Sequence, residues 1–125
     1  MESRSFGSVR IFSLNRAKVL ECLRQAVAQL VERRPEVERI WLFGSLARGD
    51  AVPGSDADVL LVLDASPKPF HERGADYAFD RCGVGVDVLA YTHEEFDQLP
   101  ERSPRFYRTV LEEHLVLYER SASAS

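Results

Sequence analysis

Two short stretches of this chain combine polar residues in a way that suits reaction chemistry. In the first, Gly44 and Ser45 follow directly after an apolar run. A Gly-Ser turn that leads into a helical turn offers backbone N–H groups and a hydroxyl, which suit an anion such as phosphate. Arg48 lies one turn further on and could add a bidentate contact to that anion, although a surface ion pair with Asp50 or Asp56 would use the same geometry. Both interpretations of Arg48 stay open.

The second stretch carries two acids, Asp56 and Asp58, at the start of the apolar run Val59–Leu63. Ten residues separate Ser45 from Asp56. Side chains two positions apart in a strand emerge on the same face, so the two carboxylates would repel each other unless a cation joined them. Divalent ions such as Mg²⁺ prefer oxygen ligands of this kind and often share them with substrate phosphates. The pair therefore indicates a metal site.

A third acid, Asp87, stands early in the run Val86–Tyr91, whose β-branched residues predict a strand in which an acid is unusual. A predicted helix separates this run from Val59–Leu63, so the two strands should be parallel, with their starts side by side. The earlier run Ile40–Phe43 reaches Val59–Leu63 by a short connection, which favours antiparallel pairing and brings its end to the same edge. All of the polar features should meet there, as two-metal phosphoryl transfer requires.

Further segments are expected to support these strands. Apolar residues recur at helical spacing from Asn15, a candidate N-cap, to Arg34, and Pro35 should end that helix. Thr92 and Glu95 form a capping-box pattern that should begin another helix. Helices are also expected over residues 70–81 and 105–113, and an edge strand over residues 115–118. This order of elements predicts an α/β fold with a small mixed β-sheet and flanking helices.

Length and composition agree with a single domain. The chain has 125 residues, of which 45% are hydrophobic and 29% charged, which is enough for one core and a charged surface. We expect the domain to span residues 1–120 and residues 121–125 to form a flexible tail. The apolar runs are far shorter than the ~18 residues that a membrane span needs, and the polar start of the chain shows no signal-peptide pattern. No membrane partner is therefore expected.

The formal net charge of -4 disfavours a protein that binds nucleic acid directly. Basic patches supply most of the affinity for a phosphate backbone, and an acidic chain offers few of them. The same charge does not disfavour an enzyme that meets phosphates through bound cations.

The two cysteines, Cys22 and Cys82, fit no metal-ligand spacing and are too few for a disulfide scaffold. Cys82 is expected to be a small buried residue. A reducing, cytoplasmic location is therefore predicted.

The stretch from Gly44 to Asp50, followed by Ser55-Asp56-Ala57-Asp58, resembles the signature of the DNA polymerase β-like nucleotidyltransferase superfamily. Together with the small size of the chain, it is similar to the minimal nucleotidyltransferase (MNT) group of that superfamily, over residues 11–120. The resemblance implies the nucleotidyltransferase fold. It also implies that AMP is transferred from ATP, with two Mg²⁺ ions and release of pyrophosphate.

Carried over by position, the resemblance also implies the site residues. The catalytic and metal-binding carboxylates would be Asp56, Asp58 and Asp87, and the nucleotide-binding turn would be Gly44-Ser45. Two departures from the motif are mild: Asp50 often appears as Glu, and Ala57 as a larger aliphatic residue. Ala57 should point away from the metals, so we interpret its small size as a change in packing.

Many MNT proteins are antitoxins that adenylylate a tyrosine of a HEPN-family toxin, so the resemblance implies such a toxin as partner in a hetero-oligomer. Two other functions stay open. One is small-molecule transfer of the aminoglycoside type, although a domain of this size has little chain to spare for an acceptor pocket. The other is a non-catalytic antitoxin that blocks its toxin. Asp→Asn variants would separate this last function, because a blocking antitoxin would still neutralise its toxin.

Overall fold

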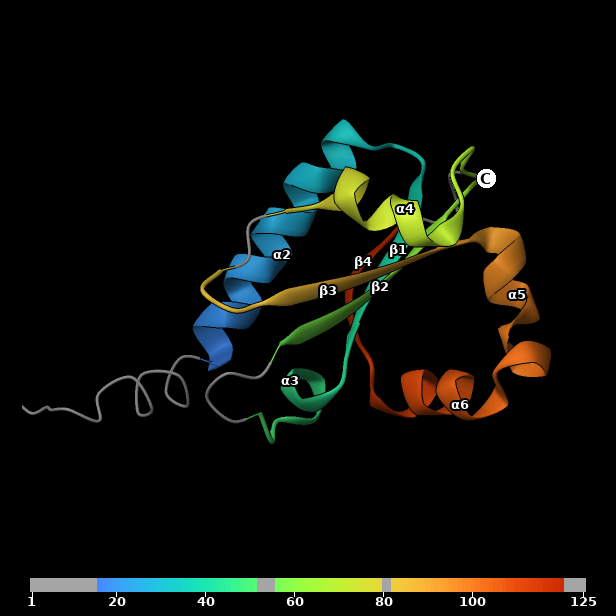
Figure 1. Cartoon of the computed structure of the whole chain (residues 1–125). Helices are drawn as coiled ribbons and strands as arrows, with labels where there is room; N and C mark the ends of the chain where they lie inside the picture. Colours follow the sequence, from blue (N-terminus) through green and yellow to red (C-terminus); the bar gives the residue numbers. More distant parts are fainter. Residues whose placement is uncertain (1–15, 52–55, 80–81, 121–125) are drawn as a thin grey trace, which may run out of the picture.

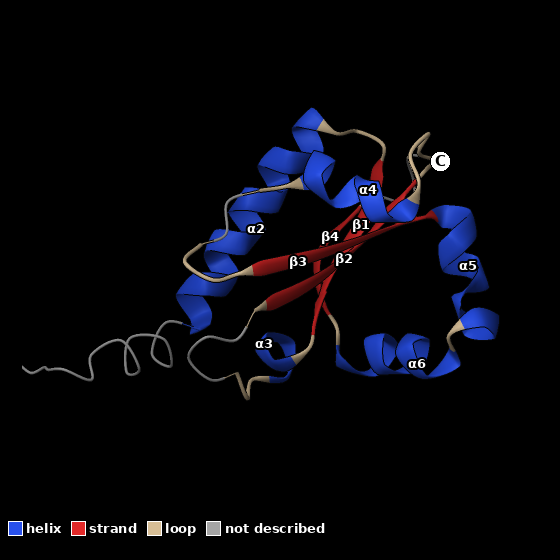
Figure 2. Ribbon diagram, in the orientation of Figure 1, coloured by secondary structure: helices blue, strands red, loops and turns tan. Residues whose placement is uncertain are grey.

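The computed structural model describes residues 16–51, 56–79 and 82–120 of the chain. Within these ranges the strands form one four-stranded sheet, with helices on both of its faces (Figures 1 and 2). The strands are β1 Val37–Phe43, β2 Ala57–Leu63, β3 Val86–Thr92 and β4 Leu115–Glu119. The helical elements are α2 Arg16–Arg33, α3 Ser45–Arg48, α4 Phe70–Arg73, the 3₁₀ turn η1 Gly74–Tyr77, α5 His93–Arg102 and α6 Pro104–Glu113.

The sheet is mixed, as predicted, and its strand order is β3-β2-β1-β4. β2 pairs in parallel with β3, whereas β1 pairs antiparallel with both β2 and β4. The parallel pair follows from the crossover through α4 and η1, and the antiparallel pair from the short connection between β1 and β2. The predicted strands and the predicted edge position of residues 115–118 are therefore confirmed.

Two apolar cores cover the two faces of the sheet. Along β2 the side chains alternate: Val59 and Leu61 are buried in the core under α2, while Leu60 and Val62 are buried in the core under α5 and α6. This alternation explains why the run is apolar at every position. Asp58 has the same parity as Leu60, so it belongs to the face that α5 and α6 cover.

The helix predicted over residues 70–81 is wrong in its length. α4 ends at Arg73, η1 continues only to Tyr77, and Ala78 is already extended. Gly74 lies at the change from one helical form to the other, and glycine is a poor residue for a continuing helix. The Arg73 guanidinium is also drawn to the carbonyls of Lys68 and Ala90, which holds this turn against β3. Residues 80 and 81 lie outside the described residues.

The other helix predictions fare better. α2 matches the helix predicted up to Arg34, although its candidate N-cap Asn15 lies outside the described residues. Thr92 caps α5, and both bonds of the capping box with Glu95 are present. No helix in the described ranges has both the length and the apolar character needed to cross a membrane. The predicted tail, residues 121–125, falls outside the described part of the chain.

The two cysteines, judged too few for a disulfide scaffold, are nevertheless paired with each other. Cys22 of α2 and Cys82, in the turn before β3, form a disulfide with their Cα atoms 5.8 Å apart. The two residues are 60 positions apart in the sequence, so local spacing gave no sign of the pair; the fold brings them together. The cytoplasmic location rested on unpaired cysteines and stays a prediction without that support.

Candidate active site

The three predicted acids lie at the ends of β2 and β3 that adjoin the end of β1. Asp58 stands opposite Asp87 in the parallel register and opposite Phe43, the last residue of β1. Residues that face each other in neighbouring strands share a face of the sheet, so both carboxylates belong to the α5 and α6 side. Asp56 comes one residue before β2 and is exposed.

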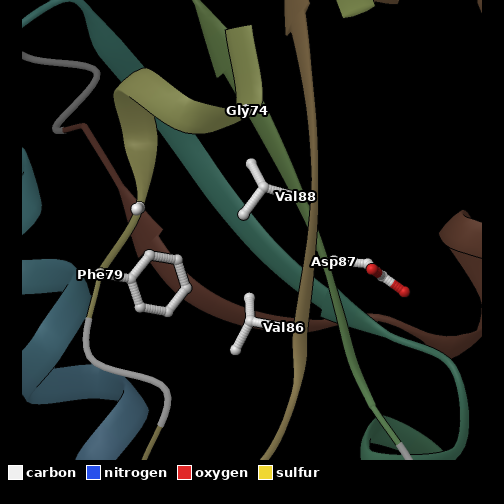
Figure 3. A pocket seen from close by; sticks show the side chains of 6 residues that line it. Gly74, Phe79, Val86, Asp87 and Val88 are labelled. Carbon is white, nitrogen blue, oxygen red and sulfur yellow. The ribbon is translucent and has the colours of Figure 1, made fainter.

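The Asp87 carboxylate points away from the hollow on the other side of β3. Figure 3 shows Phe79, Val86 and Val88 on one side of the strand and the Asp87 carboxylate on the opposite side. The hollow has a volume of about 200 Å³, and Gly74 and Ala78 also line it. The Asp87 carboxylate thus lies on the opposite side of β3 from the hollow, although Asp87 is among the residues that line it.

Asp58 is in electrostatic reach of both other acids. Its pKa is raised above the usual value, first by burial and then by the charges of Asp87 and Asp56, while the charge of Arg48 lowers it. Burial and like charges both disfavour an ionised carboxyl group. A cation bound among the three acids would remove this penalty.

Gly44 is required at its position for two independent reasons. Its φ of 84° lies in the left-handed region, which side chains rarely adopt. In addition, a Cβ at Gly44 would overlap Asp58 Oδ2 and lie 3.4 Å from its Cγ. The end of β1 and the start of β2 therefore approach closely, and this contact places Ser45 and the first turn of α3 beside Asp58.

The turn after Gly44 is closed by backbone bonds and by one arginine. The amides of Arg48 and Gly49 donate to the carbonyls of Gly44 and Ser45 at 3.0 and 2.9 Å. Arg16 of α2 donates from Nε and Nη2 to the carbonyls of Leu46 and Ala47 in α3, at 3.0 and 3.2 Å. Arg16 was not singled out from the sequence, because its partners are backbone atoms 30 residues away.

Arg48 forms ion pairs with two acids. Its Nε lies 3.1 Å from Asp50 Oδ2, and its Nη1 lies 2.9 Å from Glu113 Oε1 of α6. The pair with Asp50 is one that the sequence left open, whereas Glu113 was not anticipated. The side chain is 43% exposed, so an anion can still reach it. Its role in nucleotide binding stays a prediction.

Two small residues beside the acids behave differently. Ala57 is fully buried in the core under α2, so it points away from the acids as expected. Gly85, for which the sequence predicted no role, lies against the Asp56 side chain. The carbonyl of Gly85 accepts a hydrogen bond from the amide of Ala57 at 2.7 Å. The signal that could have found it is a glycine two residues before the acid of the third strand.

The acids suit a divalent cation by their chemistry. As their side chains stand, no three His, Cys, Asp or Glu residues in the described ranges already form a group that could hold a metal ion. The donors nevertheless fit one, since Asp58 is a partly buried carboxylate whose charge two neighbouring carboxylates oppose. Hard ions such as Mg²⁺ prefer such oxygen donors. The assignment of Asp56, Asp58 and Asp87 as metal ligands stays a prediction.

Comparison with known proteins places this arrangement in a family. Residues 22–117 match the family model described as a nucleotidyltransferase domain. The chain is 37% identical over 92 residues to a proposed protein adenylyltransferase of Methanocaldococcus jannaschii, which covers 68% of this chain and 82% of that protein.

Solved structures show the same fold. A proposed nucleotidyltransferase from Sulfolobus solfataricus superposes with a TM-score of 0.59 and 22% identity, over 88% of this chain and 86% of the other. A toxin-antitoxin structure with AMP-PNP superposes with a TM-score of 0.56 and 18% identity, over 80% and 76% of the two chains. A mutant of the MntA-HpeT toxin-antitoxin gives a TM-score of 0.53 and 17% identity, over 78% and 73%. The predicted α/β fold is thereby confirmed.

Proposed function

This chain belongs to the family of nucleotidyltransferase domains. We propose that it transfers AMP from ATP to the hydroxyl group of a tyrosine on a partner toxin of the HEPN type. Nucleotide transfer itself follows from family membership. The observation that carries the proposal is the facing pair Asp58 and Asp87, which lies beside the Gly44 turn. Carboxylates placed next to a phosphate-binding turn are what a nucleotidyl transfer needs.

The proposed reaction exchanges a phosphoanhydride bond of ATP for a phosphoester bond to the acceptor. The acceptor oxygen forms a bond to the α-phosphorus of ATP, the bond from that phosphorus to the bridging oxygen of pyrophosphate breaks, and the hydroxyl proton leaves the acceptor. Asp87, on the edge strand β3, would receive that proton. Asp56, Asp58 and Asp87 would hold two Mg²⁺ ions, which when bound supply charge neutralisation for the triphosphate and acidify the acceptor hydroxyl.

The turn at the end of β1 would hold the phosphates. Ser45 offers its hydroxyl, and the first turn of α3 offers its backbone N–H groups beside Asp58. Arg48 would exchange one of its carboxylate partners for a phosphate oxygen and bind it through its guanidinium fork. These groups orient the triphosphate relative to the acids.

A protein acceptor is supported by size and by relatives. The described domain is one sheet with a helix layer on each face, which leaves little chain for a closed acceptor pocket. The similar protein of Methanocaldococcus jannaschii is named for protein adenylyl transfer, and two similar structures are toxin-antitoxin assemblies. A partner toxin would supply both the acceptor and the missing wall of the site.

The test is to purify the chain together with a candidate HEPN-type toxin and to add ATP and Mg²⁺. Mass spectrometry should find one or more adenylyl groups on a tyrosine of that partner, and none with the Asp58→Asn variant. Adenylylated small molecules and an unmodified partner would contradict the proposal. So would full neutralisation of the toxin by both Asp56→Asn and Asp58→Asn, which would indicate a blocking antitoxin.

A further inference from the structure

Gly85 lies beside the candidate metal site without contributing a side chain to it. It precedes β3 by one residue and stands one step before the first registered pair of β2 and β3, so its partner across the parallel strands is Asp56. Its carbonyl accepts the 2.7 Å hydrogen bond from the amide of Ala57, which joins the two backbones at this level. Asp56 and Gly85 thus repeat, two residues earlier, the facing arrangement of Asp58 and Asp87.

The space that a side chain at Gly85 would need is already filled. A Cβ there would overlap Asp56 Oδ1 and lie 3.0 Å from Asp56 Cγ. Within the described ranges, the glycines with positive φ are Gly44, Gly49 and Gly83, so the backbone of Gly85 does not itself require glycine. The close approach of the Asp56 carboxylate is the reason for a glycine at this position.

We propose that Gly85 is a positioning residue, whose missing side chain leaves the room in which the Asp56 carboxylate lies beside those of Asp58 and Asp87. This inference rests on the proposed function, since it assigns Asp56 to the same cation site. The three atoms nearest to a Cβ at Gly85 all belong to Asp56. A methyl group there would therefore displace this one acid and leave the facing pair of acids in place.

The test measures Mn²⁺ affinity directly, by electron paramagnetic resonance titration without nucleotide. Gly85→Ala should bind Mn²⁺ about ten- to a hundredfold more weakly than the wild type, the range found when groups that orient metal ligands are changed. Gly74→Ala is the matched control. Gly74 has right-handed helical angles, and its Cβ would meet only the Val88 carbonyl, at an ordinary 3.6 Å, so its Mn²⁺ affinity should equal that of the wild type.

A double-mutant cycle separates positioning from a general structural role. In the Asp56→Ala background the displaced carboxylate is absent, so adding Gly85→Ala should cost no further Mn²⁺ affinity. An equal loss in both backgrounds would overturn the proposal, as would a Gly85→Ala variant that binds Mn²⁺ like the wild type. If Gly85→Ala alone fails to fold, the double variant should recover folding because the overlap is gone, and failure to recover would overturn the proposal.

These outcomes are distinct from failure of the proposed function. A wild type that binds Mn²⁺ but transfers no AMP would contradict the proposed function, while the ratio of Mn²⁺ affinities would still support or overturn the role of Gly85. A wild type that binds no Mn²⁺ would overturn the role of Gly85 outright.

Discussion

The Asp58 carboxylate lies close to a second acid and to the backbone of Gly44. Asp87 faces it across the parallel strands, and Oδ2 of Asp58 occupies the space where Gly44 would carry a Cβ. Burial and the charges of Asp87 and Asp56 raise the pKa of Asp58. The surroundings therefore oppose the negative charge of Asp58. At the scale of single residues, this conflict is what a bound divalent cation would relieve.

Arg48 gives a prediction about the nucleotide. If Arg48 binds a phosphate of ATP, replacing it by glutamine should raise the KM for ATP about tenfold with little change in kcat. The lost charged hydrogen bond would stabilise the bound ATP and the transition state equally, so its loss weakens binding without slowing the chemical step. Steady-state kinetics at saturating Mg²⁺ would measure this effect. Glu113→Gln is the matched control: it removes a competing partner of Arg48 and should not raise the KM. Unchanged kinetics in Arg48→Gln would contradict the assignment.

At the scale of elements, a buried arginine fastens the connection between β2 and β3 to the rest of the fold. Arg73 is only 4% exposed, and its guanidinium lies 2.6 and 3.2 Å from the two carboxylate oxygens of Glu95. The same carboxylate accepts a bond from the Thr92 amide in the capping box of α5. One acid therefore links α4, the end of β3 and the start of α5.

Replacing Arg73 by methionine should lower the free energy of unfolding by about 2–3 kcal/mol, because the bonds from its buried guanidinium to Glu95 and to the Lys68 and Ala90 carbonyls are lost. Urea denaturation would measure the loss, and Arg73→Lys, which keeps the charge but not the fork, should lose less. Arg73 lowers the pKa of Glu95 in the folded protein. The stability from the ion pair is thus present above the unfolded pKa of Glu95 and is lost as pH falls through its folded pKa. The difference in stability between wild type and Arg73→Met should therefore shrink in acid, leaving the part that the bonds to the Lys68 and Ala90 carbonyls contribute. A difference of the same size in acid and at neutral pH would contradict this account.

How much could be predicted from the sequence differed from one element to the next. The strands, their directions and the pairing of Asp58 with Asp87 were predictable, because apolar runs and connection lengths determine which strands can be neighbours. The short α4 was not, since its end depends on where the Arg73 side chain finds partners. Gly85 was missed for a similar reason, because the need for a glycine there comes from the close approach of the Asp56 side chain, which is distant in the sequence.

At the scale of the whole molecule, the disulfide joins the α2 layer to the turn that leads into β3. Cys22 and Cys82 close a loop that contains β1, α3 and β2, and therefore most of the candidate site. A cross-link of this kind restricts the unfolded chain far more than the folded one. The disulfide also links the turn before Gly85 to α2, which covers the face of the sheet opposite to that of Asp58 and Asp87.

The Cys22→Ser/Cys82→Ser double variant should be less stable than the oxidised wild type by about 2–4 kcal/mol. Guanidinium denaturation with and without a thiol reductant would test this. Reductant should lower the stability of the wild type towards that of the double variant and leave the double variant unchanged. Two reactive thiols in the untreated, folded wild type would contradict the pairing.

The measurement that tests the central claim most directly uses ATP labelled on either the α- or the γ-phosphate, with the purified partner protein and Mg²⁺. The wild type should transfer the α label to the partner and leave the γ label in pyrophosphate. Asp58→Asn, with an unchanged circular dichroism spectrum, should transfer neither. Transfer of the α label by Asp58→Asn at the rate of the wild type, or transfer of the γ label by the wild type, would contradict the account.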